Sequence, residues 1–364
     1  MRNFGENLYT QYSSVPVRFG YSQSLFGYNY LKWEKKLAPL KFEKAKQQFL
    51  YAREATASSA IRHFFDLATA QAEYAMALKN IESADTLFVA GKEKNEYGIV
   101  SHADLLTLEL DLINANNALE NAITQLELAT SAFHSFYGLD NNGEITLDLP
   151  NTFPELTILA EEALFQMKEN NPDILHYRQQ ELESEQSVEQ MQKTGGVDAY
   201  FSASIGFNQA ANRMMDVYNY PLRQDMVNVT VSVPLVDWGT RSRRINAAKN
   251  NRNITMQTIE QDEYNLEQEI LATVSEFNRQ QGLTKKSLEA YKMATTVYDI
   301  NKQRFIIGKT DVNTLTLSLN RKDSAHRNYL SALNRYWILY YNLRKLTLFD
   351  FEKQEKLSIE NSWE

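Results

Sequence analysis

The chain repeats its own pattern at a distance of 210 residues, and this repeat constrains the fold more than any other feature. Without a gap, the shift places Val17 on Val227, Gly98 on Gly308 and Leu105 on Leu315. Further identities fall at Ser22/Ser232, Leu25/Leu235, Ala38/Ala248, Ala115/Ala325, Ala122/Ala332 and Asp140/Asp350. Each match is weak alone, but together they predict two tandem copies of one structural unit.

Both copies carry a heptad pattern behind the matching glycine. In the first copy the pattern steps alternately by three and four residues: Leu105, Leu108, Leu112, Ala115, Leu119, Ala122, Leu126, Ala129, Phe133 and Phe136. The second copy keeps the spacing: Leu315, Ser318, Lys322, Ala325, Tyr329, Ala332, Tyr336, Leu339, Leu343 and Leu346. This period predicts long helices packed as coiled coils, and Lys322 is the position that departs from it.

The prolines mark where long helices can run. All seven lie outside the windows from Leu40 to Leu149 and from Leu235 to the C-terminus: Pro16, Pro39, Pro150, Pro154, Pro172, Pro221 and Pro234. Because proline breaks helix interiors, each window can hold a helix of about 65 residues, close to 100 Å long. Each copy should contain a strand, a long helix, a break at Gly98 or Gly308, and a returning helix that ends near Asp140 or Asp350.

A strand is predicted ahead of the second long helix. Residues 227 to 235 are apolar at every odd position, and Asn228, Thr230, Ser232 and Pro234 fill the even positions. This period of two predicts one apolar and one polar face, over roughly the 9 to 11 residues that a tilted strand needs to cross a bilayer. A second alternating run, 199–207, should precede it, joined by a polar loop over 208–224. Before both strands a helix is predicted over 156–192.

Composition argues against several classes of function. The formal charge is −8, so no broad basic surface is available for a nucleic-acid partner. The chain has no cysteine, and its five histidines are scattered without metal-ligand spacing. No nucleophile with a base and no phosphate-binding loop is present, so the sequence predicts neither an enzyme nor a cofactor or metal site. No apolar run is long enough for a transmembrane helix, so a membrane role must depend on strands.

The order of strands and helices, with particular residues at their junctions, resembles the TolC-like outer membrane efflux protein family over nearly the whole chain. The residues that carry the resemblance are Pro234, Leu235, Asp237, Gly239 and Arg241 after the strand, Ala247 and Ala248 in the helix, Gly308 and Leu315 at the far turn, and more weakly Leu25, Phe26, Gly27, Gly98, Asp104 and Leu105. The resemblance implies a mainly α fold with a few strands. Its trimer would form one β-barrel in the outer membrane and an α-helical barrel across the periplasm.

The family also implies a function and partners. The chain would be the outer-membrane channel of a tripartite efflux or type I secretion system, a passive conduit for exported solutes. Its partners would be two further copies of itself, a periplasmic adaptor, an inner-membrane pump and outer-membrane lipid. From the residues alone, a soluble coiled-coil scaffold or spacer remains the alternative.

Two groups of site residues are expected. Residues at the strand-to-helix junctions, most of them aromatic or basic, are predicted to lie at a membrane interface: Tyr28, Tyr30, Trp33, Pro234, Trp238, Gly239 and Arg241. Core packing is the alternative for Trp238. At the far turns, the resemblance predicts a periplasmic tip and gate formed by Gly98, Asp104, Gly308, Lys309, Thr310, Thr314 and Leu317.

The gate differs from the family pattern. In the family, acidic residues six and nine positions after the second glycine line the constriction, and here Thr314 and Leu317 stand there. Asp104 matches, six positions after Gly98, with Lys309 and Thr310 as candidate partners. Alternatively, Asp104 supports the first helical turn after Ser101.

The repeats divide the chain into residues 1–150 and residues 151–364. Subtracting 210 from 156–207 gives numbers below one, so the first repeat lacks the leading helix and first strand of the second. The chain is therefore interpreted as truncated at its N-terminus, with a signal peptide, a helix and a strand encoded upstream.

Overall fold

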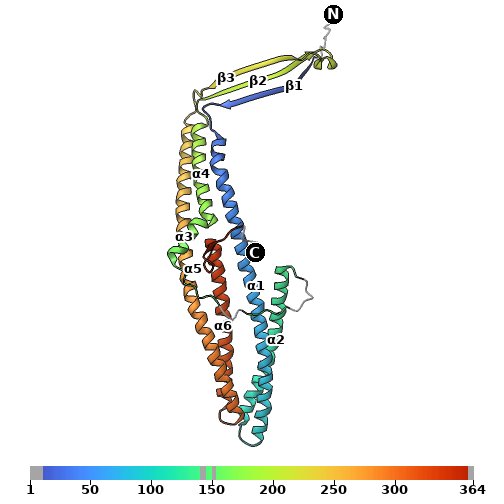
Figure 1. The fold of residues 1–364 in the computed structure, drawn as a ribbon, viewed down its shortest axis with the longest axis vertical. Helices are drawn as coiled ribbons and strands as arrows, with labels where there is room; N and C mark the ends of the chain where they lie inside the picture. Colours follow the sequence, from blue (N-terminus) through green and yellow to red (C-terminus); the bar gives the residue numbers. More distant parts are fainter. Residues whose placement is uncertain (1–10, 140–144, 150–152, 360–364) are drawn as a thin grey trace. The chain divides into compact units, whose positions relative to one another are not determined.

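The computed structural model describes residues 11–139, 145–149 and 153–359 (Figure 1). Contacts between residues divide the chain into two compact units. Unit 1 comprises residues 1–42 and 175–262, and unit 2 comprises residues 43–174 and 263–364. The predicted division at residues 150 and 151 follows the repeats instead. It lies outside the described residues and stays a prediction.

The helices reproduce the internal repeat of the sequence. Helices α1 (Tyr30–Glu96) and α5 (Thr240–Ile306) each have 67 residues, and α2 (His102–Tyr137) and α6 (Val312–Thr347) each have 36. Each start and each end in the first copy is therefore separated from its counterpart in the second by the same shift that aligns the sequence. The two tandem copies and the long helices of the sequence analysis are confirmed. Asp140, the expected end of the first returning helix, lies outside the described residues.

Pro39 corrects the assumption that proline bounds the long helices, because it lies inside α1. Proline cannot donate the backbone hydrogen bond to the carbonyl four residues earlier, so one bond of the helix is lost. Pro39 is exposed, whereas Trp33 and Leu37 on the same helix are only 4% and 1% exposed, so the helix around the proline is packed on its other side.

Unit 1 contains an antiparallel sheet in the order β1-β2-β3. Its strands are β1 (Tyr12–Ser24), β2 (Asp198–Ala211) and β3 (Leu222–Ser232), which lie side by side in Figure 1. The predicted loop over 208–224 is too long. Leu222 pairs with Asn208 and Gln224 with Gly206, and a short 3₁₀ helix, η1 (Met214–Tyr218), lies in the connection that remains between β2 and β3. The strands continue into these polar segments because the hydrogen bonds between strands involve only main-chain groups.

The predicted single helix over 156–192 is also wrong, because it is two helices, α3 (Ala160–Asn170) and α4 (Pro172–Lys193). A residue before proline disfavours helical backbone, and Asn171 is accordingly extended. Its side chain stabilises the break within unit 2. The Asn171 Nδ2 donates to the carbonyl of Leu346 at 2.8 Å, and its Oδ1 accepts from the Asp173 amide at 2.8 Å.

Two apolar clusters hold unit 2 together. The larger joins α3, α5, α6 and the following segment through side chains that include Met167, Ile270, Phe277, Tyr336 and Leu343. The smaller joins all four repeat helices near the far turns through Leu87, Leu108, Tyr298, Phe305, Val312 and Leu315. A short strand pair, β4 (Phe349–Asp350) with β5 (Glu355–Lys356), follows α6 and was not predicted.

The heptad positions are the packed ones. In α2 every member of the predicted run except Phe136 is buried or partly buried, and in α6 every member is. Among the described residues, no helix combines the length and apolar composition that a membrane span requires.

Candidate functional site

One face of the three-stranded sheet is apolar across all its strands. Paired residues share a face, and the pairs include Phe19 with Ile205, Ala203 with Val227 and Phe201 with Val229. Most of these side chains are open to the surroundings: Phe19, Ile205, Val227, Val229 and Val231 are 54–76% exposed. The opposite face carries mainly serine, threonine, asparagine and glycine. The alternation seen in the sequence therefore becomes an exposed apolar surface, which ends near the start of β3, where Arg223 pairs with Phe207 and Asp225 with Ile205 on the same face.

A tight turn joins β3 to α5. Trp238 and Gly239 both have positive φ, at 54° and 74°. The Asp237 carboxylate accepts from the amides of Gly239 (3.0 Å) and Arg241 (3.2 Å), and so caps the helix. These amides lower the pKa of Asp237. A bulky residue is strained in the left-handed region, so this turn is unusual as well as exposed.

The predicted junction residues take different positions around this turn. Trp238 is 87% exposed, which excludes core packing within the described chain. The Arg241 guanidinium donates to the carbonyl of Gln192 at 2.6 Å and thereby ties α5 to the last turn of α4. A Cβ on Gly196 would lie 3.1 Å from that guanidinium, so glycine leaves the space for it. Pro234 is exposed beyond the end of β3.

The first junction is built differently. The Tyr28 hydroxyl accepts from Gln186 at 2.6 Å, and Tyr30 is 57% exposed. Trp33 is buried, and its indole N–H donates to Glu189 at 2.9 Å. Tyr30 and Trp238 are thus open to the surroundings, whereas Trp33 packs among the helices of unit 1.

At the first far turn, Gly98 adopts φ 69°, and α2 begins four residues later at His102. Ser101 is the N-cap of α2, where its Oγ accepts from the Asp104 amide at 3.1 Å and donates to the Asp104 carboxylate at 2.7 Å. Within the described chain no ion pair joins Asp104 to Lys309. The geometry matches the helix-start interpretation of Asp104 and does not test a role in gating.

The second far turn has the same geometry, but the carboxylate and the hydroxyl have changed places. Gly308 adopts φ 72°, and Asp311 caps α6 by accepting from the amide and the hydroxyl of Thr314, both at 2.8 Å. The Thr314 amide, followed by its hydroxyl, lowers the pKa of Asp311. Asp311 occupies the position of Ser101, and Thr314 that of Asp104. Sequence reasoning missed Asp311, although the shift between the two repeats, applied to Ser101, would have found it.

Lys94 is a second residue that the sequence analysis missed. Its ammonium donates to the carbonyls of Phe305 and, at 3.1 Å, Ile306, and lies 4.6 Å from the centre of the Phe305 ring. A cation there is favourable, because the last carbonyls of a helix are its negative end. Lys94 thus joins the two far turns within unit 2. Lys309 and Leu317 are exposed, and Thr310 is half-buried.

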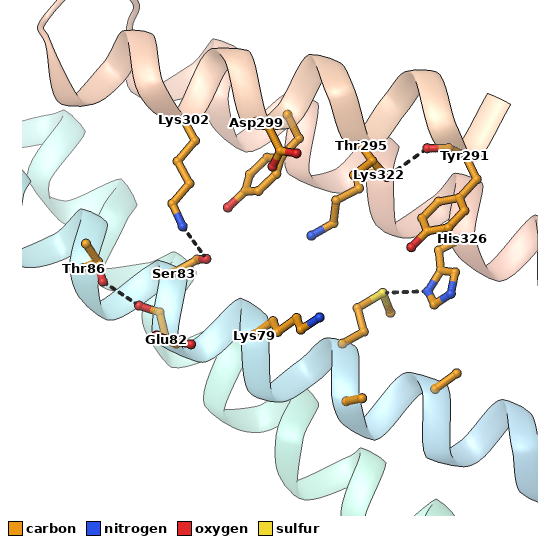
Figure 2. A pocket seen from close by; sticks show the side chains of 14 residues that line it. Lys79, Glu82, Ser83, Thr86, Tyr291, Thr295, Asp299, Lys302, Lys322 and His326 are labelled. Atoms are coloured by element: carbon orange, nitrogen blue, oxygen red, sulfur yellow. Dashed lines mark hydrogen bonds between the residues drawn. The ribbon is translucent and has the colours of Figure 1, made fainter. Parts of the chain in front are cut away.

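A solvent-open pocket of about 640 Å³ lies between α1, α5 and α6 in unit 2 (Figure 2). Lys322, the outlier of the heptad pattern, projects into it and donates to Asn80 at 3.3 Å. Its ammonium also lies 4.5 Å from the centre of the Tyr298 ring, while Lys302 donates to Ser83 at 3.1 Å. The lysines therefore link helices of different repeats. Among the described residues, no cluster of side chains is suited to a metal ion.

Comparison with known proteins assigns the family and the fold. A family model described as outer membrane efflux protein matches residues 163–347. No curated protein sequence matches the chain. Among solved structures, the chain is similar to the CmeC outer membrane channel of Campylobacter jejuni, with a TM-score of 0.73, 14% identity, and coverage of 96% of this chain and 77% of that one.

Two further structures agree. The outer membrane protein VceC of Vibrio cholerae matches with a TM-score of 0.67 and 13% identity, covering 96% of this chain and 88% of that one. The open-state outer membrane channel MtrE of Neisseria gonorrhoeae matches with a TM-score of 0.68 and 13% identity, covering 93% and 81%. These similarities establish a TolC-like fold. Because the family model covers half of the sequence, the chain belongs to the outer membrane efflux protein family.

Proposed function

We propose that the protein is the outer-membrane channel of a tripartite efflux or type I secretion system. It acts as a passive conduit for exported solutes, without enzymatic activity or a cofactor. A homotrimer spans the outer membrane and extends into the periplasm, where an adaptor connects it to an inner-membrane pump. Membership of the family supports this assignment, and the exposed apolar face of the sheet carries it.

That face is suited to lipid. An exposed apolar surface on a sheet with a polar opposite face matches a strand that contacts hydrocarbon on one side and water on the other. In water, a sheet so exposed would be marginal and prone to association. In a bilayer the same side chains are solvated by acyl chains.

The exposed edges and helix faces support assembly with further copies. Among the described residues, no strand pairs with the outer edge of β1 or of β3, and unpaired backbone groups are costly in hydrocarbon. In unit 2, two helices carry apolar stripes at least 46% exposed: Leu106, Leu110 and Ile113 on α2, and Met293, Val297 and Ile300 on α5. Chemical cross-linking in native membranes should stop at trimers, and a ladder ending at dimers contradicts this assembly.

A matched pair of variants tests the membrane assignment. Val229 and Thr230 are neighbours on β3, both exposed, on opposite faces of the sheet. Val229→Arg places a cation on the apolar face, at a cost of about 2–4 kcal/mol near the middle of a bilayer, whereas Thr230→Arg faces water. In outer-membrane fractions of cells expressing the full-length protein, V229R should be depleted severalfold and T230R retained. Equal retention of both, or recovery of the wild type without detergent, favours the soluble scaffold.

Asp104 is our candidate for a gate residue, together with Gly98, Gly308, Lys309, Thr310, Thr314 and Leu317 at the tip. Asp104→Asn removes the charge but keeps a side chain able to hydrogen-bond Ser101, so the helix start is preserved. If the carboxylate gates, single-channel conductance in planar bilayers should rise or lose its sensitivity to cations. The control is Asn313→Ala, because Asn313 is an exposed residue at the second far turn. Unchanged conductance in D104N contradicts the gating role.

A further inference from the structure

A basic groove lies among the helices of unit 1. It has a volume of about 740 Å³ and is lined by the start of α1, the end of α4 and a segment of α5. Its cations are Lys32, Lys36, Lys193, Lys249 and Arg252, and its carboxylates are Glu185 and Glu189. The groove therefore carries a formal charge of +3 in a chain whose net charge is −8. A local excess of positive charge on a chain that is negative overall indicates that the groove binds an anionic ligand.

Both carboxylates are already engaged. Glu189 accepts from the Trp33 indole at 2.9 Å and lies 3.9 Å from Lys32 and 4.0 Å from Lys193. Glu185 accepts from Arg252 at 3.2 Å. These acids hold the walls of the groove together, and they leave part of its positive charge uncompensated.

Two lysines supply that uncompensated charge. Among the described residues, neither Lys36 nor Lys249 has a carboxylate within ion-pair distance. The Lys36 ammonium lies 4.6 Å from the centre of the Trp33 ring, which holds it at the groove. Lys249 lies on α5, one turn before Arg252. An anion bound between Lys36 and Lys249 would contact ammonium groups from two helices, α1 and α5.

We propose that this groove binds the phosphate of an anionic phospholipid headgroup. The proposal rests on the membrane function given above. Lys32 is in the first turn of α1 and Lys193 is the last residue of α4, only a few residues before β2. One end of the groove therefore lies near the start of the sheet, on the side where headgroups lie beside a transmembrane strand. Val188 adds an apolar side chain to the lining of the groove.

A lipid fits this position better than free phosphate. The acyl chains of a bound lipid would cover the exposed apolar sheet of the same unit, so binding at the two surfaces is linked and strengthened by effective concentration. Free phosphate would gain only the charge interaction, which salt screens.

The test measures lipid binding to the full-length protein in neutral detergent by native mass spectrometry. The probes are phosphatidylglycerol, phosphatidylcholine and inorganic phosphate. The variant Lys36→Gln/Lys249→Gln removes two exposed lysines of the groove, and Lys286→Gln/Lys292→Gln removes two exposed lysines of α5 in unit 2. Each lysine near an anionic headgroup contributes about fivefold in affinity, so the groove variant should bind phosphatidylglycerol about 25-fold more weakly. The control should change less than twofold.

Three results overturn the proposal. Wild type that binds phosphatidylcholine as tightly as phosphatidylglycerol has no preference for an anion. A groove variant that keeps wild-type affinity shows that the lipid binds elsewhere. Inorganic phosphate that binds as tightly as the lipid makes the groove a free-phosphate site. Conductance of the same samples in planar bilayers separates the two proposals, because a conducting protein without lipid preference refutes only the groove.

Discussion

Replacement of Arg344 by methionine should destabilise unit 2 strongly. Arg344 on α6 lies 3.2 Å from the Glu54 carboxylate of α1 and 3.1 Å from the Asp350 carboxylate of β4. The side chains of Glu54 and Asp350 are only 3% and 5% exposed. Without the guanidinium, two buried carboxylates lose their shared cation, and breaking a buried ion pair in this way costs about 3–5 kcal/mol.

The same helix provides the control. Arg335 on α6 also pairs with a carboxylate, that of Glu276, but its side chain is 51% exposed. Such a surface pair contributes about 0–1 kcal/mol, so Arg335→Met removes an equal charge at little cost. For a chain of 364 residues, the R344M midpoint should fall by about 4–6 °C, and the R335M midpoint by about 1 °C. Circular dichroism of the detergent-solubilised proteins measures both. Equal losses would refute the argument that burial sets the cost.

Three further predictions concern unit 2. Burial acts to raise the pKa of Asp350, but the Tyr340 hydroxyl, the Lys353 and Glu352 amides and Arg344 lower it overall. The ionised Asp350 carboxylate therefore contributes to the free energy of unfolding above its unfolded pKa of about 3.9, and this contribution is lost as the pH falls through the lower pKa of the folded state. The thermal unfolding midpoint of Asp350→Asn should accordingly fall less on acidification than the midpoint of the wild type. Leu343 is fully buried, and Leu343→Ala should cost about 2–5 kcal/mol in chemical denaturation. Gly98→Ala should cost about 1–2 kcal/mol because φ is 69°, whereas Gly282→Ala inside α5 should be neutral or stabilise by up to about 1 kcal/mol.

The sequence predicted the helices well because their spacing is redundant. The constant shift between the repeats, the two far glycines and the heptads all constrain the same elements, so an error in one signal is corrected by another. The apolar face of the sheet was equally predictable. A strand buries or exposes alternate side chains, and the predicted period of two is preserved in the pairing of Val227, Val229 and Val231. The predicted run ends too late, because β3 stops at Ser232 and residues 233–235 lie beyond it.

What could not be predicted depends on tertiary contacts. Pro39 lies inside α1, a helix whose neighbouring Trp33 and Leu37 are buried, and burial is not a local property of sequence. The break at Asn171 depends on the carbonyl of Leu346, which is distant in sequence. The strands also extend past the alternating runs into the predicted loop. This extension depends on the neighbouring strand, which supplies main-chain hydrogen bonds whatever the side chain.

The exchanged caps at the far turns show how a repeat can keep a structure while its residues change. Ser101 with Asp104 and Asp311 with Thr314 each combine one carboxylate with one hydroxyl, and either order satisfies an amide at the start of the helix. The fold of the turn therefore requires one carboxylate and one hydroxyl at these two positions, but it does not determine which position carries the charge. The acid stands at the cap in the second copy and three residues after the cap in the first, so one structural position accepts either a carboxylate or a hydroxyl.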